Sequence, residues 1–357
     1  MKKSAEPSGY AGTGSISLLG GFSLEMNGAT LTDDINRSLK LWSVLAYLVL
    51  HRNRPVPQSE FIELFWPEDN SSNPVNALKT LLYRIRAMLE PLFGPEVQPI
   101  LAQRGAYSWN PAVTCELDAD RFEALCFQAS NEDLPDAARI ELYRQAVALY
   151  QGDLLPKLNH QMWLIPLSVH YHTLYLEAVK ALAAEIARKS ILVARDADKL
   201  LPLPTGKKIL VVEQKVKEYN DMQWHSGILY EACMRQSRHV DYQETAYSYD
   251  DADKTAIMAR ARDYDLLVIT SYFLRGKLSN REWLEGFLAD CKTPAVIVTN
   301  TPFEEISIPK NARNVVITFA TSPANVKATA EVLFGKCKAE GKMPVKNGIS
   351  VSAEAMV

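Results

Sequence analysis

The chain has 357 residues, of which 47% are hydrophobic and 23% are charged. This length is enough for about two to three domains, and the composition is that of an ordinary globular protein, not of a disordered, fibrous or low-complexity chain. The formal net charge of −3 excludes polycation behaviour of the whole chain. Any contact with nucleic acid must therefore come from a local basic patch.

The cysteines and the apolar runs indicate the cellular compartment. The five cysteines are scattered and form no Cys-x-x-Cys pair, which argues against a disulfide framework and against a thiolate zinc site. No run reaches the roughly 18–20 apolar residues of a membrane helix, and the first residues are followed by a Gly/Ser-rich run instead of the apolar core of a secretory signal. We therefore expect a cytoplasmic protein with no membrane contact, no metal and no cofactor.

The N-terminal third changes its hydrophobic period from strand-like to helical and back. In chain order, the pattern predicts a β-meander at 15–31 with a turn at Asn27-Gly28, helices from Ser38 and at 59–65, a long helix at 73–90, and a strand, tight turn and strand at 100–109. Asn73 and Pro74 suit the start of the long helix, and Pro91 and Gly94 are expected to end it. A small sheet, three helices and a terminal hairpin, in this order, predict a winged helix-turn-helix domain.

The remainder of the chain is first helical and then alternates between strands and helices. Helical patterns are expected at 118–130, 134–150 and 161–188. Beyond them, apolar runs at 191–193, 208–212, 266–269, 295–298 and 315–318 alternate with helical patterns at 226–236, 251–263, 279–290 and 323–335. The three-helix stretch is typical of a helical-repeat fragment, which needs a stacked neighbour to bury its second face. Continuous Val/Ile/Leu runs between helices predict an open sheet of roughly five strands, mostly parallel and covered on both faces.

The predicted fold is therefore multidomain: a winged helix-turn-helix, an α-helical repeat-like segment, and an α/β open sandwich with a mostly parallel sheet. The expected parts are a disordered N-terminus (1–14), the winged-helix domain (15–112), the helical domain (113–188), the α/β sandwich (189–345) and a frayed tail (346–357). These boundaries follow the changes of hydrophobic period along the chain.

The long helix at 73–90 has a polar face with cations and neutral hydrogen-bond donors and with no acid before Glu90. This face carries Asn76, Lys79, Thr80, Tyr83, Arg84 and Arg86. The alternative is that this face contacts only solvent. The position of the helix argues for a DNA contact instead, because it is the third helix of the module and precedes a turn that carries Arg104. In a major groove, Arg and Lys reach guanine edges or phosphates and Asn pairs with adenine, while an arginine on a hairpin tip suits a phosphate or the adjacent minor groove. We therefore expect this face and Arg104 to contact DNA.

Other titratable groups form no recognisable site. His170 and His172 lie two residues apart on a helical stretch, so they point to different faces and cannot share a metal there. The aspartates within 250–253 predict a loop and N-cap before the next helix, and Glu304 and Glu305 are expected on a solvated loop. No G-x-x-x-x-G-K-[ST] phosphate loop occurs in the sequence.

The N-terminal half resembles a known family of regulators. Residues 15–110 resemble the winged-helix output domain of bacterial response regulators, in the version found in bacterial transcriptional activators of the antibiotic-regulatory type, on segments 16–22, 73–86 and 104–107. Residues 116–185 resemble the helical bacterial transcriptional activator domain that follows in that family, on segments 120–125, 148–155 and 163–176. The resemblance implies a DNA-binding regulator that recruits RNA polymerase, often as a dimer on repeated half-sites.

The C-terminal half resembles a different family. Residues 185–345 are similar to the second domain of family-3 glycoside hydrolases, in the β-N-acetylglucosaminidase branch, on segments 187–193, 200–203, 208–212, 265–270, 294–298, 333–335 and 341–345. In that family the nucleophilic aspartate lies on a (β/α) barrel that precedes this domain. The roughly 185 residues before it here cannot contain the roughly 250 of a barrel. The two carboxyl groups of a retaining glycosidase cannot be assigned either.

The leading hypothesis is a non-enzymatic, sequence-specific DNA-binding transcriptional regulator. Double-stranded DNA is its expected partner, RNA polymerase and a second copy of the chain are further partners, and the appended α/β domain is a sugar-sensing or structural part. One alternative is a glycosidase remnant or accessory subunit that acts with a separate barrel. Another is a fusion of two unrelated halves without joint function, because both resemblances break off within one helical stretch, 175–190.

Overall fold

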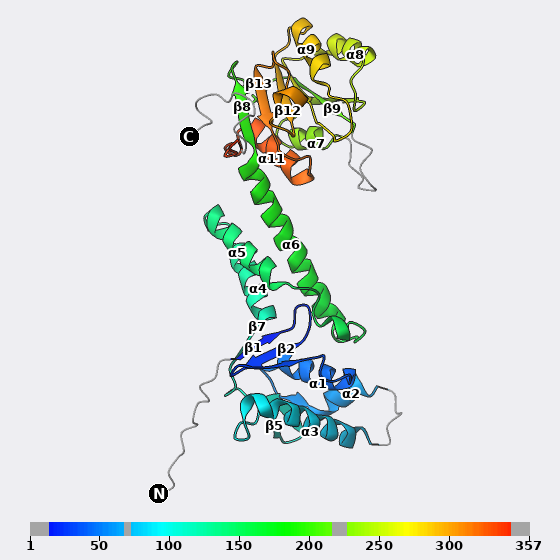
Figure 1. Ribbon diagram of the computed structural model, residues 1–357, viewed down its shortest axis with the longest axis vertical. Helices are drawn as coiled ribbons and strands as arrows, with labels where there is room; N and C mark the ends of the chain where they lie inside the picture. The colour runs from blue at the N-terminus through cyan, green and yellow to red at the C-terminus, as the bar shows by residue number, and fades with distance from the viewer. Residues whose placement is uncertain (1–13, 68–72, 216–226, 344–357) are drawn as a thin grey trace. The chain divides into compact units, whose positions relative to one another are not determined.

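The computed structural model describes residues 14–67, 73–215 and 227–343, and the expectations for the two termini lie outside these ranges. The chain divides into two compact units, Met1–Leu182 and Ala183–Val357. The first unit contains helices and two small sheets, and the second contains a larger sheet with helices (Figure 1). The expectation of a multidomain chain with helical and α/β parts is thus confirmed. None of the helices in the described ranges combines the length and the apolar content needed to cross a bilayer.

The first unit begins with a four-stranded sheet. Its strands are β1 (Gly14–Ser17), β2 (Ser23–Met26), β3 (Ala29–Thr32) and β7 (Cys115–Leu117), in the order β3-β2-β1-β7. Strands β1 and β7 are parallel, and the other pairs are antiparallel. The predicted turn joins β2 to β3, where Asn27 and Gly28 have φ values of 53° and 80°. Two successive residues with positive φ form the two-residue hairpin turn that Asn-Gly favours.

Three helices and a second small sheet follow. The helices are α1 (Leu39–Leu50), α2 (Gln58–Phe65) and α3 (Pro74–Phe93), and the strands are β4 (Val56–Pro57), β5 (Ile100–Gln103) and β6 (Ala106–Trp109), in the order β4-β6-β5. The expectation that Pro91 ends α3 is wrong, because the helix continues through it to Phe93 and ends at Gly94, which has φ 82°. Leu92 and Phe93 are buried, and their packing holds the last turn although Pro91 lacks one backbone hydrogen bond.

The helical segment of the first unit shares its hydrophobic core with the two small sheets. Its elements are α4 (Asp118–Ala129), α5 (Asp136–Leu149), the short 3-10 helix η1 (Pro156–Leu158) and α6 (Ile165–Ser190), as the helical pattern predicted. The last part of α6, from Ala183 onward, belongs to the second unit. The Asp118 carboxylate accepts hydrogen bonds from the backbone N–H groups of Leu18 and Leu19, at 2.8 and 3.0 Å. The expected boundary between residues 112 and 113 therefore lies inside one compact unit.

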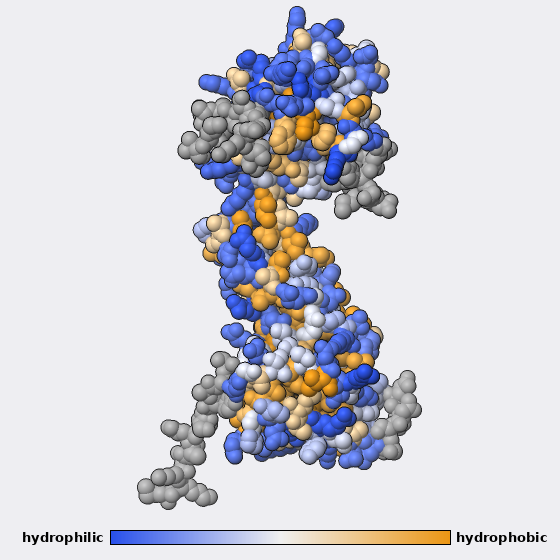
Figure 2. Space-filling model, viewed as in Figure 1, coloured by the Kyte–Doolittle hydropathy of each residue, from blue (hydrophilic) through white to orange (hydrophobic). Residues whose placement is uncertain are grey.

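Apolar side chains are exposed along α6. Ile165, Val169 and Leu176 have exposed fractions of 41%, 59% and 53%. They lie on one helix face, because spacings of four and seven residues return to the same side of an α-helix. Figure 2 shows hydrophobic surface over the same helix. This exposed face agrees with the expectation that a helical-repeat fragment leaves one side without a neighbour.

The second unit is built on a six-stranded sheet. Its strands are β8 (Leu192–Asp196), β9 (Ile209–Gln214), β10 (Val240–Thr245), β11 (Leu266–Thr270), β12 (Ala295–Thr299) and β13 (Asn314–Ile317), in the order β10-β9-β11-β12-β13-β8. Five strands are parallel, and β8 pairs antiparallel with β13 at the edge. The sequence pattern missed β10, an edge strand whose Asp241, Gln243 and Glu244 interrupt the apolar run.

Helices cover both faces of this sheet. They are α7 (Ile228–Met234), α8 (Asp251–Ala261), α9 (Arg281–Asp290), α10 (Glu304–Ser307) and α11 (Pro323–Leu333). One core combines α7 and α11 with one set of alternate strand residues, and the other core combines α8 and α9 with the opposite set. Within the described residues, the parallel strands form an open, doubly covered sheet and not a closed barrel.

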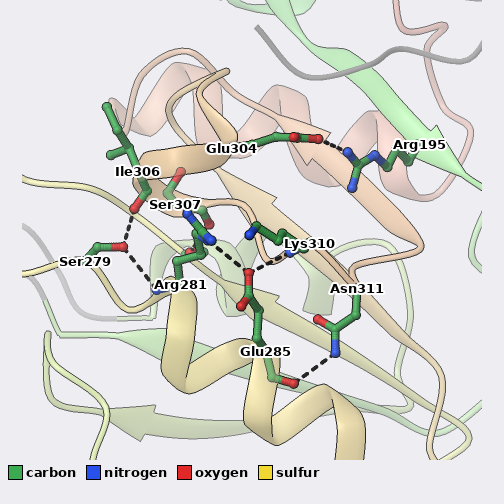
Figure 3. A network of polar contacts seen from close by, with 10 residues as sticks. Arg195, Ser279, Arg281, Glu285, Glu304, Ile306, Ser307, Lys310 and Asn311 are labelled. Carbon is green, nitrogen blue, oxygen red and sulfur yellow. Dashed lines mark hydrogen bonds and ion pairs between the residues drawn. The ribbon is translucent and has the colours of Figure 1, made fainter.

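Polar side chains fix the helix starts and loops of the second unit. Asp250 caps α8, because its Oδ1 accepts from the Asp253 N–H at 2.8 Å, which confirms the predicted N-cap. Glu285 on α9 accepts from Arg281 Nε and from the Lys310 N–H, both at 2.9 Å, which holds the pKa of Glu285 below its ordinary value (Figure 3). Glu304, expected on a solvated loop, instead starts α10 and forms an ion pair with Arg195.

Candidate nucleic-acid interface

Helix α3 has a capped start and one buried, apolar side. The Asn73 side chain accepts a hydrogen bond from the Asn76 N–H at 2.9 Å, and Pro74 occupies the first helical turn. This is the capped start that the sequence predicted. The apolar side of the helix is buried and consists of Leu78, Leu81, Leu82, Ile85, Leu89, Leu92 and Phe93. The opposite side of α3 is therefore the exposed one.

Five of the predicted DNA-contacting residues lie on this exposed side. They are Asn76, Lys79, Thr80, Tyr83 and Arg84. At about 100° per residue, Tyr83 lies near the centre of the face, with Lys79 and Arg84 on its two flanks. Tyr83 is 72% exposed. Within the described part of the chain, Lys79, Tyr83 and Arg84 have no hydrogen-bond or ion-pair partner. The face thus presents two cations and a phenol that no other described group engages.

Arg86, the sixth residue predicted on this helix, has a different environment. It is half-buried, and its Nε and Nη2 donate to the Ile100 carbonyl oxygen at 3.3 and 3.2 Å. Ile100 lies opposite Trp109 in the antiparallel β5–β6 pair, between the hydrogen-bonded pairs, so its carbonyl points away from β6. Arg86 therefore connects α3 to the outer edge of β5.

The turn between β5 and β6 carries the last predicted residue. Arg104 and Gly105 have φ values of 46° and 79°, so the turn is again the two-residue type with positive φ at both positions. The Gly105 carbonyl accepts from the Gln58 N–H at 2.9 Å, which ties the turn to the start of α2. The Arg104 side chain is exposed and has no partner among the described residues. The hairpin therefore holds a cation at its tip.

A polar network that the sequence did not reveal supports the two preceding helices. Tyr47 on α1 donates to Glu60 Oε1 on α2 at 2.5 Å, and Arg54 Nη1 donates to Glu60 Oε2 at 3.0 Å. Burial and the neighbouring Glu60 raise the pKa of Tyr47 to about 12, and the hydrogen bond from Arg54 lowers the pKa of Glu60. The three residues come from three separate segments, so no local pattern could have predicted their contact.

The two histidines have separate acidic partners. His170 Nε2 lies 2.9 Å from Glu123 Oε1, and His172 Nδ1 lies 3.2 Å from Asp153 Oδ1. In the ranges that the structure describes, no three His, Cys, Asp or Glu side chains are grouped so that they could hold a metal ion.

Glu213 is a buried carboxyl group of the second unit with a raised pKa. It lies at the end of β9, is 5% exposed, and accepts hydrogen bonds from the N–H groups of Leu229 and Tyr230 at 3.0 and 3.1 Å. Burial raises its pKa to about 7. Both carboxylate oxygens are thus occupied by the first turn of α7, which indicates a structural contact.

Comparisons with known proteins support one class of regulator. Residues 117–198 match the bacterial transcriptional activator domain family, and no curated protein matches the chain. Because the match covers α4, α5 and α6, it supports a transcriptional activator-like regulator.

Several solved structures are similar to parts of this chain. Mycobacterium tuberculosis EmbR, in complex with a low-affinity phosphopeptide, is 22% identical and has a TM-score of 0.41, over 49% of this chain and 46% of that chain. A family-3 β-N-acetylglucosaminidase from a Paenibacillus species is 18% identical and has a TM-score of 0.40, over 59% of this chain and 48% of that chain. A β-glucosidase from Listeria innocua is 16% identical and has a TM-score of 0.39, over 60% of this chain and 32% of that chain. This chain spans less than half the length of each.

Proposed function

We propose that this chain is a sequence-specific DNA-binding transcriptional regulator, and that β1–β3, α1–α3 and the β5–β6 hairpin form a winged helix-turn-helix. The observation that carries the proposal is the exposed face of α3. There Lys79, Tyr83 and Arg84 have no partner among the described residues, and the nearby hairpin ends in an equally unpaired Arg104. The match of residues 117–198 to a domain of transcriptional activators supports the same function.

The chemistry of this surface suits duplex DNA. A major groove accepts one α-helix, and arginine and lysine reach guanine edges or phosphates from it, while Asn76 can pair with an adenine edge. Thr80 Oγ1 donates to the Asn76 carbonyl at 2.9 Å, so it faces DNA chiefly as an acceptor. Arg104 on the hairpin tip suits a phosphate or the adjacent minor groove.

Arg86 has a positioning role in this proposal. Its guanidinium already donates twice to Ile100, so it sets the spacing between α3 and β5. Because α3 is proposed to enter the groove and β5 belongs to the wing, that spacing determines whether both can contact one duplex. One guanidinium nitrogen of Arg86 remains for a phosphate.

We also propose partners for the helical segment and a role for the second unit. RNA polymerase and a second copy of the chain are proposed partners of the helical segment, whose α6 exposes Ile165, Val169 and Leu176. The second unit is proposed to be non-catalytic and to bind a sugar or to serve as a structural appendage. Turnover of a chromogenic N-acetylglucosaminide by the purified chain would contradict the non-catalytic part.

Selection of bound duplexes from a random pool by the full chain tests the proposal. We expect an enriched motif, and we expect its affinity to exceed that of a scrambled duplex and to fall as salt concentration rises. Equal affinity for the selected and scrambled duplexes would show that binding is non-specific and would contradict the sequence-specific part of the proposal. Failure to bind any duplex at low salt would overturn the proposal.

A further inference from the structure

The outermost line of α3 is uncharged, although cations lie on both sides of it. Its four exposed residues are Asn76, Thr80, Tyr83 and Ala87. At about 100° per residue, these positions lie within about 60° of one another around the helix, and Lys79 and Arg84 lie outside them on opposite flanks. A major groove about 12 Å wide just admits a helix, so the outermost line faces the base edges and the flanks lie nearer the two strands.

Thr80 presents a methyl group on this line. Its Oγ1 donates to the Asn76 carbonyl oxygen at 2.9 Å, one helical turn earlier. The hydroxyl is thereby turned to the helix backbone, which leaves the Cγ2 methyl as the free end of this exposed side chain. In the major groove, thymine is distinguished by its 5-methyl group, and a threonine methyl is among the groups that contact it. Thr80 is therefore suited to a thymine.

The side-chain amide of Asn76 is available for a base edge. The Asn76 backbone N–H donates to the Asn73 side chain and its carbonyl accepts from Thr80, so both backbone groups are engaged. The side-chain amide has no hydrogen-bond partner in the part of the chain that the structure describes. Such an amide forms two hydrogen bonds with N6 and N7 of adenine. Asn76 and Thr80 are about 6 Å apart along the helix axis, or about two base-pair steps.

We propose that the duplex bound by α3 presents an adenine to the Asn76 amide and, within about two base pairs of it, a thymine methyl group to the Thr80 methyl. The inference rests on the proposed function and adds the class of sequence that this surface selects, a core that contains A·T pairs. From the flanks, the long side chains of Lys79 and Arg84 reach phosphates or the outer base edges. Glu90 follows on the same side of the helix, and its carboxylate repels phosphate, so the contact surface ends before it.

Exchange of thymine for uracil tests the methyl contact, because it removes only the 5-methyl group. The full chain is titrated by fluorescence anisotropy against the duplex selected from the random pool, with each thymine replaced in turn. We expect one position at which uracil weakens binding about 3- to 5-fold, the effect of one buried methyl group.

The variant Thr80→Ser keeps the hydroxyl and removes the methyl. It should bind the thymine and uracil duplexes equally at that position. The matched control is Thr255→Ser, at an exposed threonine of α8 whose Oγ1 donates to the Asp251 carbonyl oxygen at 2.9 Å, again one turn earlier. This control should keep the full difference between thymine and uracil.

Exchange of adenine for 7-deazaadenine tests the amide contact, because it removes the N7 acceptor. At one adenine we expect a loss of affinity of about 5-fold or more, and Asn76→Ala should abolish this loss. The other adenines of the same duplex serve as the control, since their exchange should affect the unmodified chain and Asn76→Ala alike.

Failure of this inference and failure of the proposed function give different results. If the chain selects no motif, the proposed function fails. If it selects a motif that lacks A·T pairs, or if no uracil or 7-deazaadenine exchange weakens binding, the inference is overturned while the proposed function stands. Losses that persist in Thr80→Ser and Asn76→Ala would overturn it as well, because other residues would then make the contacts.

Discussion

Arg84 and Lys79 both face solvent on α3, and a DNA interface would use them in different ways. If Arg84 reads a base, Arg84→Ala should weaken binding to the selected duplex by about 1–3 kcal/mol and relax the preference at one base position. Lys79→Ala should weaken binding to all duplexes alike and lower the slope of log affinity against log salt by about 1. Fluorescence anisotropy at several salt concentrations measures both effects. The matched control is Arg121→Ala, at an exposed arginine of α4 outside the proposed interface. Unchanged affinity in Arg84→Ala would remove Arg84 from the interface.

Glu213 makes the stability of the second unit depend on pH. Because burial raises its pKa from 4.5 to about 7, the folded chain keeps a proton that the unfolded chain releases in this range. Its contribution is therefore fully present below pH 4.5 and is lost as the pH rises through about 7, with a total of the order of 3 kcal/mol. The neighbouring Glu231 and Glu244 act in the same direction.

The variant Glu213→Gln tests this dependence. It should flatten the change in unfolding free energy between about pH 4.5 and 7, measured by denaturant unfolding at a series of pH values. The readout is the slope, because the amide can also alter the absolute stability through its contact with the Leu229 and Tyr230 N–H groups. Glu282→Gln, at an exposed carboxyl on α9 that is not among the groups acting on Glu213, should keep the slope of the unmodified chain. An unchanged slope in Glu213→Gln would contradict the assignment.

At the scale of elements, the contact between α3 and β5 depends on one side chain. Arg86→Ala removes both hydrogen bonds to the Ile100 carbonyl and should lower the unfolding free energy by about 1 kcal/mol. If the helix and the hairpin bind one duplex together, the variant should also weaken DNA binding while the preferred sequence stays the same. Arg86→Lys should restore part of the stability, because an ammonium can still donate to Ile100. A changed base preference would instead make Arg86 a direct contact.

The sequence predicted those helices, strands and turns correctly whose structure depends on neighbouring residues. It failed where the position of a segment in the folded unit decides. The Asn27-Gly28 and Arg104-Gly105 turns were both expected, because glycine readily adopts positive φ and such pairs favour two-residue turns. Both turns occur, with positive φ at all four residues. Strand β10 was missed because an edge strand does not need a continuous apolar pattern. Pro91 was expected to end α3, yet burial of Leu92 and Phe93 outweighs the missing hydrogen bond.

At the scale of the whole molecule, the chain has two units with separate hydrophobic cores. One core belongs to residues up to Ala178, and the two others begin at Ala187 and Leu192. We therefore expect two transitions in differential scanning calorimetry, because units without a common core unfold independently. Fragments that consist of residues 1–182 and 183–357 should each reproduce one transition. A single cooperative transition would contradict this prediction and the hypothesis of two unrelated halves.

The sequence by itself determined the order of most helices and strands, the polar face of α3 and the change from helical to α/β architecture. These features depend on periodicity, capping and turn residues, which act over a few positions. It also indicated both family resemblances. It could not indicate how Arg54, Glu60 and Tyr47 combine, because their contact joins separate segments.

Tertiary structure alone decided which cations on α3 remain available. Lys79 and Arg84 project from the open side of the helix, whereas Arg86 turns to a carbonyl 14 residues further along the chain. The same holds for Glu213, whose perturbed pKa arises from its burial against α7. In each case the deciding partner is distant in sequence, and only the folded chain brings the two together.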